Sequence, residues 1–214
     1  MYHIRYQFLT ICICGYGIVC AEQRNITASN ALVKLLRLQQ LTSGFLRLDE
    51  TENPMQISAE KQDVLTEVLE EIDTKRFKVV IFTKFVHDLN VVERVANEME
   101  LSYGEISGRR KDLSDDATFP DGVTILGVQI QAGGLGIDLS DACYAIYYSM
   151  GFSLGDYEQS KARLHRPGQT NRVTNIHLLA RDTIDFKVYG ALRSRQEVVN
   201  SILNRKDLEW TNGS

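Results

Sequence analysis

One run of residues, Lys78-Val79-Val80-Ile81-Phe82-Thr83, constrains the fold more than any other part of the chain. The run is β-branched or aromatic almost throughout and does not alternate with polar residues, which is the pattern of a strand buried on both faces. Such a strand needs a layer of helices on each side of its sheet. We therefore expect it to be a central strand of a parallel sheet in an α/β domain.

The rest of the chain alternates between helical and strand patterns. The expected elements are a helix over Ala28–Leu41, a helix capped by Ser58 that runs to Ile72, a helix over Val86–Met99, a strand over Ser102–Ile106, a polar helix or turn over Arg109–Ala117, a strand over Val123–Val128, a strand over Cys143–Tyr148, a helix that begins near Tyr157 and stops at Pro167, a strand over Val173–Leu179 and a helix from Asp182 to about Asn204. This alternation predicts a three-layer sandwich around a mainly parallel sheet, preceded by helices.

Both ends of the chain are expected to lie outside this domain. We assign residues 1–25 to an apolar N-terminal segment, 26–205 to the domain and 206–214 to a flexible tail. The stretch Phe8–Val19 resembles the short apolar core of a signal peptide and is too short to span a bilayer as a helix. Three interpretations of this stretch stay open: an export signal, a packing segment and the stub of a longer polypeptide. Self-association by exchange of the stretch between copies also stays open.

Charge and cysteine usage exclude two classes of protein. The chain has 24 Lys and Arg against 28 Asp and Glu, a net charge of about -4, which argues against a uniformly basic nucleic-acid binder. A local basic groove remains compatible with the clusters at 109–111 and 161–172. The four cysteines lack the spacing of metal ligands, so we expect reduced thiols and no metal site.

The segment Tyr157–Gln169 carries the strongest signal for chemistry. In a helix that Pro167 and Gly168 terminate, Gln159, Arg163 and Arg166 would share one face. A guanidinium stays protonated and offers forked donors to phosphate oxygens. The segment therefore predicts a phosphate-binding face, and the alternative is a solvated basic face with no ligand.

A glycine-rich loop, Gln131-Ala132-Gly133-Gly134-Leu135-Gly136-Ile137-Asp138-Leu139, follows a predicted strand. Glycines let backbone N–H groups approach phosphates, and Asp138 could accept a hydrogen bond from a ribose hydroxyl or a facing arginine. We expect this loop and the arginine segment at the same carboxyl edge of the sheet, where ligands of open α/β sheets bind. The alternative is a tight loop that needs positive φ. The pattern is not G-x-G-x-x-G, so a Rossmann dinucleotide site is not expected.

Two further segments follow strands of the predicted sheet. Thr83 and Lys84 could hydrogen-bond a nucleic-acid backbone, or Thr83 or a following residue could cap the next helix. Gly108 with Arg109-Arg110-Lys111 could contact phosphates, or could form a solvated turn. The histidines at 87, 165 and 177 show no ligand or triad pattern and are interpreted as structural.

These segments together carry a resemblance to a known family. In chain order, Val79–Thr83, Gly104–Gly108, Gln131–Leu139 and Gln159–Gln169 resemble motifs IV, IVa, V and VI in the second RecA-like lobe of superfamily-two helicases. Within that group the chain is most similar to SWI/SNF-like DNA translocases, and among these to bacterial and phage members. The resemblance runs from about Asn25 to Leu203 and implies a RecA-like fold in a cytoplasmic protein.

The resemblance also implies a reaction shared between two lobes. ATP with Mg²⁺ would bind between this lobe and a first lobe, in cis or in trans, that holds the phosphates and the metal. The two lobes together would couple ATP hydrolysis to movement along duplex DNA. By resemblance Arg166 would be the arginine finger and Arg163 its companion. Residues near the nucleotide would be Gln159, Gly134, Gly136 and Asp138, and residues near the DNA backbone would be Thr83, Lys84, Gly108, Arg109, Gln131 and Gly133.

The chain departs from a complete enzyme in one respect. It contains neither G-x-x-x-x-G-K-[ST] nor a DEAH-like acidic quartet, so the phosphate cradle and the Mg²⁺ ligands would lie on the first lobe. We therefore expect no turnover by this chain alone. Gln131 stands where relatives often have arginine, which weakens a direct phosphate contact there. The alternative hypothesis is a non-catalytic DNA- or protein-binding module with the same fold.

Overall fold

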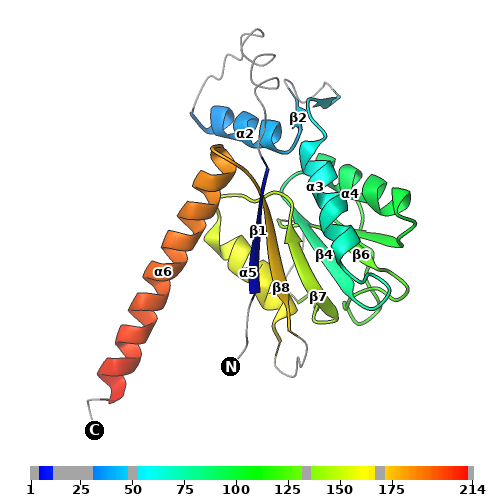
Figure 1. Ribbon diagram of the computed structural model, residues 1–214. Helices are drawn as coiled ribbons and strands as arrows, with labels where there is room; N and C mark the ends of the chain where they lie inside the picture. Colours follow the sequence, from blue (N-terminus) through cyan, green and yellow to red (C-terminus); the bar gives the residue numbers. More distant parts are fainter. Residues whose placement is uncertain (1–4, 12–30, 48–52, 132–135, 167–171, 212–214) are drawn as a thin grey trace.

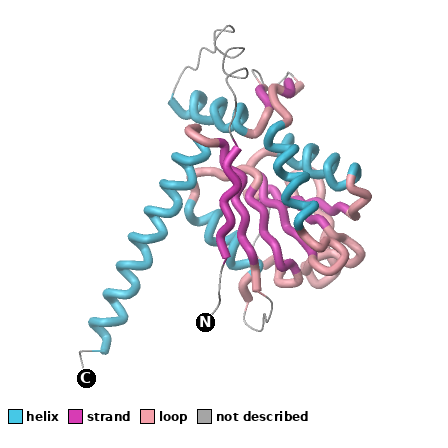
Figure 2. The backbone as a smooth tube through the Cα atoms, viewed as in Figure 1, coloured by secondary structure: helices cyan, strands magenta, loops and turns pink. Residues whose placement is uncertain are grey.

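The computed structural model describes residues 5–11, 31–47, 53–131, 136–166 and 172–211. Its centre is a six-stranded sheet in the order β1-β8-β7-β4-β6-β5, and every pair of neighbouring strands is parallel (Figures 1 and 2). The strands are β1 (Arg5–Ile11), β4 (Lys78–Thr83), β5 (Tyr103–Ile106), β6 (Ile125–Gln129), β7 (Ala142–Tyr147) and β8 (Thr174–Ala180). The expected α/β fold with a parallel sheet is confirmed.

The apolar run Lys78–Thr83 forms β4, which lies near the middle of the sheet between β7 and β6. Its successive side chains enter two separate apolar clusters, with Val80 and Phe82 in one and Val79 and Ile81 in the other. All four are fully buried. Because side chains alternate across a strand, this places apolar residues on both faces of the sheet, as the continuous pattern predicted.

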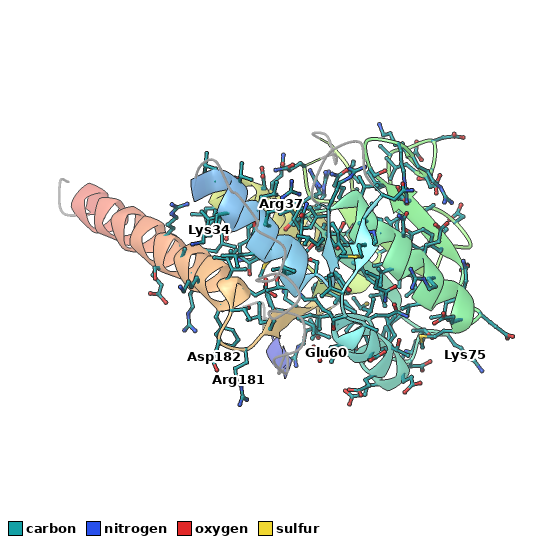
Figure 3. All side chains as sticks on the ribbon, turned by 90° about the horizontal axis from the view of Figure 1, so that it is seen from above. Lys34, Arg37, Glu60, Lys75, Arg181 and Asp182 are labelled. Carbon is teal, nitrogen blue, oxygen red and sulfur yellow. The ribbon has the colours of Figure 1, made fainter. Side chains whose placement is uncertain are left out.

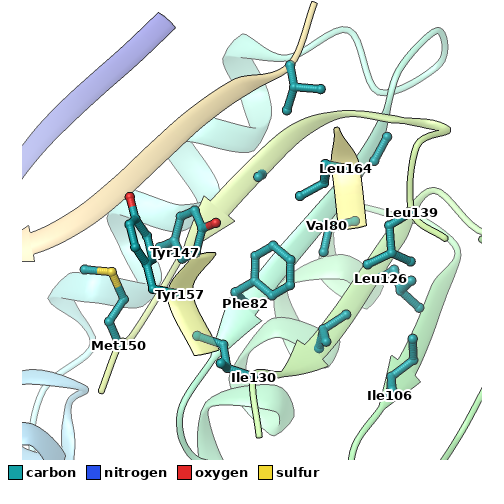
Figure 4. Packing of buried hydrophobic residues seen from close by; sticks show 14 of the residues in the cluster. Val80, Phe82, Ile106, Leu126, Ile130, Leu139, Tyr147, Met150, Tyr157 and Leu164 are labelled. Atoms are coloured by element: carbon teal, nitrogen blue, oxygen red, sulfur yellow. The ribbon is translucent and has the colours of Figure 1, made fainter. Parts of the chain in front are cut away.

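Helices cover both faces. Apolar residues of α3 (Glu60–Glu71) and α4 (Val86–Glu98) join the cluster around Val79 and Ile81. Residues of α5 (Leu154–Leu164) and α6 (Ile184–Thr211) join the cluster around Val80 and Phe82 (Figure 4). The molecule is therefore a three-layer sandwich, from which α6 extends well away from the body (Figure 1).

A further helix, α2 (Ala31–Thr42), lies across the end of the sheet where the strands finish. Figure 3 shows this helix, which carries Lys34 and Arg37, over that end of the molecule beside α6. The short pair β2 (Phe45–Leu46) and β3 (Met55–Gln56) follows it and is antiparallel. We call the two ends of the sheet the carboxyl edge, where strands finish, and the amino edge, where they begin.

The largest difference from the sequence reading is β1. No strand was expected there, yet residues 5–11 pair in parallel with β8 over its whole length, from Arg5 opposite Thr174 to Ile11 opposite Ala180. An edge strand needs only one partner, and its pattern in the sequence is the same as that of any short apolar run. The remainder of the Phe8–Val19 stretch lies outside the described residues.

Several boundaries also differ. Helix α5 begins at Leu154 and ends at Leu164, so Arg166 lies beyond it. Helix α3 begins at Glu60, whose N–H donates to Ser58 Oγ at 3.1 Å. Helix α6 reaches Thr211, beyond the expected end near Asn204. No helix in the described part of the chain has the length and apolar character that a membrane span requires.

Candidate nucleotide and nucleic-acid interface

The arginine segment and the end of the glycine-rich loop are in contact. Arg166 Nη2 donates a hydrogen bond to Ile137 O at 3.1 Å, and Arg166 Nε lies 3.6 Å from Asp138 Oδ2. Close by, Leu139 N–H donates to Arg163 O at 3.0 Å. Of the two partners proposed for Asp138, the structure shows the facing arginine. The two motifs are therefore brought together, as their order in the sequence predicted.

Their meeting point is not at the expected edge. Helix α5 leaves the carboxyl end of β7 and returns the chain to the amino end of β8, as any parallel crossover must. Its last residues therefore lie toward the amino edge. Figure 4 shows Leu164 beside Leu139 at one end of the apolar cluster, and Tyr157 beside Tyr147 at the other.

The two ends of the glycine-rich loop likewise lie at opposite edges of the sheet. Ile130 N–H donates to Thr83 O at the carboxyl end of β4. Leu139 instead comes just before Ala142, which is opposite Lys78 at the amino end of β4. The prediction of a single site at the carboxyl edge is therefore wrong, and the candidate residues divide between two edges of the sheet.

The two arginines have different environments. The Arg166 side chain is 41% exposed, whereas Arg163 is 5% exposed within α5. Burial lowers the pKa of Arg163, and the charge of Asp156 opposes this shift. Because the helix ends before Arg166, the predicted common face of Gln159, Arg163 and Arg166 does not form, and Gln159 is half-buried. Of Arg163 and Arg166, it is Arg166 that presents its guanidinium at the surface.

The glycines of the loop are described in part. Gly133 and Gly134 lie outside the described residues. Gly136 has φ of +102°, and a Cβ atom at this position would meet nothing within 4 Å. The positive φ explains the glycine, which is the alternative that the sequence left open for this loop.

At the carboxyl edge lies a cavity of about 240 Å³. It is lined by Lys84, Ile130, Gln131, Met150, Gly151, Phe152, Ser153, Asp156 and Tyr157. It brings together two residues predicted to contact DNA, Lys84 and Gln131, beside the N-terminus of α5. Ser153 caps that helix, because its Oγ accepts from Asp156 N–H at 3.2 Å.

Lys84 is not free at this cavity. Its Nζ donates to Gln39 Oε1 on α2, and its backbone N–H donates to Ser149 Oγ at 2.8 Å. Burial lowers the pKa of Lys84, and the charge of Asp88 opposes the shift. A phosphate at Lys84 would therefore have to compete with Gln39 for the ammonium group.

Thr83 does not fit its predicted role. The residue is fully buried, and its Oγ1 donates to Phe85 O at 3.3 Å. Thr83 is the last residue of β4, and its burial keeps the hydroxyl out of reach of a nucleic-acid backbone. The N-cap residue of α4 is Phe85, so a residue after Thr83 occupies the cap position, without a side-chain hydrogen bond to the helix.

Arg109 is likewise bound within the chain. Its Nε and Nη2 donate to Glu105 at 2.8 and 2.9 Å, and Glu105 is fully buried. Burial tends to raise the pKa of Glu105, but hydrogen bonds from Arg109 and Ser107 outweigh it, so the pKa is lowered. The geometry therefore gives Arg109 a role in shaping its loop. Gly108 is exposed in the same loop.

The structural reading of His177 agrees with its surroundings. Its ring is fully buried, is stacked on Tyr147 and places Nε2 3.0 Å from the Tyr157 hydroxyl. Burial lowers its pKa to about 3, so the ring is neutral at physiological pH. Within the described ranges no group of three or more His, Cys, Asp or Glu side chains is suited to a metal ion.

Sequence reasoning missed a polar network that joins α2 to the carboxyl edge. Gln39 donates to Met150 O at 2.9 Å, Thr42 donates to Asp185 at 2.8 Å, and Lys61 is 2.8 Å from the same carboxylate. The available signal was a charged residue in an otherwise apolar helical stripe, since Lys61 has the same spacing as Leu65 and Leu69.

Comparisons with known proteins place the chain in a family. The family model described as helicase conserved C-terminal domain matches residues 60–168. ATP-dependent helicase fft2 of Schizosaccharomyces pombe is 31% identical over 127 residues, which cover 57% of this chain and 10% of fft2. An uncharacterized ATP-dependent helicase of Mycoplasma pneumoniae is 26% identical over 182 residues, which cover 81% of this chain and 17% of that protein.

A chromatin-remodeling ATPase INO80 from Mycosarcoma maydis is 28% identical over 160 residues, with 72% of this chain and 8% of INO80 covered. Among solved structures, the C-terminal part of the Fun30 ATPase domain superposes with a TM-score of 0.55 at 29% identity, covering 62% of this chain and 45% of that one. The chain spans at most 17% of the length of these three curated relatives. The chain therefore belongs to the helicase conserved C-terminal domain family, and its relatives are SWI/SNF-like ATP-dependent helicases.

Proposed function

We propose that this chain is the second ATPase lobe of a SWI/SNF-like ATP-dependent DNA translocase and that Arg166 is its arginine finger. The observation that supports this most is the position of Arg166, whose partly exposed guanidinium is held against Ile137 O and Asp138 at the end of the glycine-rich loop. A fixed cation at a surface suits charge that develops on a phosphate supplied by another domain.

The residues present fit one side of a nucleotide. Arg166 supplies a cation, and Gly136, in the loop that Arg166 contacts, carries no side chain. Gln159 would border the same nucleotide. Bound ATP would supply the phosphoryl group that is transferred to water. By resemblance, the Mg²⁺ ligands and the phosphate cradle would belong to the first lobe, because the sequence holds neither G-x-x-x-x-G-K-[ST] nor a DEAH-like quartet.

The carboxyl-edge cavity is the best candidate for contact with DNA. It combines Lys84 and Gln131 with the N-terminus of α5, and all three can interact with phosphate oxygens. Gly108 lies beyond the carboxyl end of a strand of the same sheet. Since the arginine site is at the other edge, nucleotide and DNA would contact opposite ends of the glycine-rich loop.

The first test is hydrolysis by the pure chain. We expect negligible ATPase activity with or without duplex DNA, because a finger without a phosphate cradle has no bound transition state to stabilise. Addition of a separately expressed first lobe should restore activity if the two halves associate. Robust DNA-stimulated hydrolysis by this chain alone would contradict the proposal.

The second test is Arg166→Ala in the two-lobe enzyme. We expect the rate of hydrolysis to fall by about 10³-fold or more, the range found for arginine fingers. Arg193→Ala is the matched control, because Arg193 is an exposed arginine of α6 paired with Glu197. An unchanged rate in the Arg166 variant, with DNA binding intact, would instead favour a non-catalytic binding module.

A further inference from the structure

We propose that Asp138 is the positioning residue of the arginine finger and acts on the reaction through Arg166 rather than by binding the nucleotide. The inference rests on the proposed function of Arg166. Helix α5 ends at Leu164, and the following His165 has φ of -107° and ψ of 85°. Arg166 therefore lies outside the helical hydrogen-bond ladder. Its side chain is held from across the site, by Ile137 O and Asp138.

Asp138 is itself held firmly enough to serve as an anchor. Its Oδ1 accepts a hydrogen bond from Ser140 N–H at 2.9 Å, which leaves Oδ2 directed at Arg166. Its backbone N–H donates to Ala117 O at 3.0 Å, within a parallel bridge to Thr118. The next residue, Leu139, is bonded to Arg163 O. The backbone at Asp138 and Leu139 is thus tied to two separate parts of the lobe, and the carboxylate is fixed to that backbone by Ser140.

The charge state of Asp138 suits this role. Burial tends to raise its pKa, but hydrogen bonds from Ser140 and the charge of Arg166 outweigh that effect, so the pKa lies below its usual value. Asp138 is therefore a carboxylate at neutral pH. It faces a guanidinium, to which a carboxylate is attracted, whereas it would repel the phosphates of a nucleotide.

The contact is also weak enough to be reversible. The Nε–Oδ2 distance is 3.6 Å, and the two side chains are 41% and 28% exposed. Ion pairs this exposed add little to stability, because water and salt screen them. The guanidinium has five N–H donors, so Arg166 can turn some of them toward the phosphates of a nucleotide while Asp138 stays beside it. Asp138 would then keep the guanidinium in its working position during the reaction.

The first experiment uses the chain without any nucleotide. In a ¹⁵N-labelled sample, the Nε–H resonance of Arg166 should move and exchange faster with water in Asp138→Asn than in the wild type. Asn keeps an oxygen for Ser140 N–H and removes the charge. Asp141→Asn is the control, since Asp141 is an exposed acid close by that pairs with Lys78. An unchanged Arg166 resonance in Asp138→Asn would overturn the inference.

The second experiment is a double-mutant cycle in the two-lobe enzyme. Asp138→Ala should lower kcat by roughly 10-fold and change KM for ATP by less than about 3-fold, as expected for a misplaced catalytic group. In an Arg166→Ala background the same change should have no further effect. A raised KM with unchanged kcat, or additive losses, would overturn the positioning role. If Arg166→Ala alone is harmless, the proposed function fails instead.

Discussion

At the scale of single residues, Asp88 is a carboxyl group whose surroundings move its pKa far from the ordinary value. It is fully buried in α4, and its Oδ2 accepts hydrogen bonds from Ser149 and Ser43. Among the described residues its Oδ1 has no hydrogen-bond partner. Burial raises its pKa to about 7, against the opposing effects of Ser149 and Lys61. This carboxyl group therefore titrates near neutral pH, far above an exposed aspartate.

This titration predicts a pH dependence of stability. Between pH 3.8 and about 7 the folded chain keeps the proton of Asp88, whereas the unfolded chain releases it. The stabilisation is therefore present below pH 4 and is lost as the pH rises toward 7, with a total of about 4 kcal/mol at most. His177 acts in the opposite direction, because its pKa is lowered from 6.5 to about 3 and its contribution is lost as the pH falls.

Asp88→Asn separates these two effects. Urea unfolding of both proteins at pH 5 and pH 8 should show that the wild type loses more free energy of unfolding than the variant between the two values. The effect of His177 is common to both proteins and cancels in the comparison. Equal losses would show that Asp88 titrates near its ordinary pKa.

At the scale of elements, the turn after α2 is fixed by one glycine. Gly44 has φ of +86°, and a Cβ atom there would lie 2.5 Å from the backbone oxygen of Ser58. Gly44 O in turn accepts from Ile57 N–H at 2.8 Å. This close approach sets the path of the chain between α2 and α3. Ser58 lies just before α3, whose N-cap residue is Ala59 and not the expected Ser58.

Gly44→Ala should destabilise the chain more than Gly122→Ala. Gly122 also has a positive φ, of +71°, but a Cβ atom there meets nothing within 4 Å. Its replacement should cost about 1 kcal/mol, from backbone strain alone. The Gly44 variant carries the same strain plus a clash with main-chain atoms, and we expect about 3 kcal/mol or more in total. Thermal unfolding of both variants measures the difference, and equal losses would show that the Ser58 contact relaxes freely.

At the scale of the whole molecule, one buried ion pair joins elements that are distant in the sequence. Lys61 Nζ on α3 is 2.8 Å from Asp185 Oδ2 on α6, with side-chain exposures of 3% and 12%. The same aspartate accepts from Thr42 Oγ1 at the end of α2 and from Ala180 N–H at the end of β8. Four elements at the carboxyl edge therefore depend on a single carboxylate.

Asp185→Asn should cost about 3–5 kcal/mol, because it leaves the Lys61 ammonium buried without its counter-charge. Glu197→Gln, in the exposed pair with Arg193, should change stability by less than about 0.5 kcal/mol. Chemical denaturation of both variants provides the measurement. Removal of the lysine charge as well, in Lys61→Met with Asp185→Asn, should recover part of the loss, and no recovery would assign the loss to the other partners of Asp185.

Local patterns in the chain were sufficient for much of the fold. The spacing of apolar residues located β4 to β8 and the helices around them, because a strand buried on both faces and a helix with one apolar face leave different periods in a sequence. The family could also be recognised, because motifs in a fixed order survive where overall identity is low. Edge strand β1 could not be found, because its partner β8 lies far along the chain.

The positions of the candidate residues were decided by tertiary structure. Residue type and spacing in the sequence identified Arg163, Arg166, Thr83 and Arg109 as candidates. The burial of Arg163 and Thr83 and the ion pair of Arg109 with Glu105 depend on neighbours that only folding brings close. The contact of Arg166 with Asp138 depends on a crossover helix that returns the chain to the amino edge. Periodicity is a local property of the chain, whereas accessibility and charge pairing arise between segments that are distant in it.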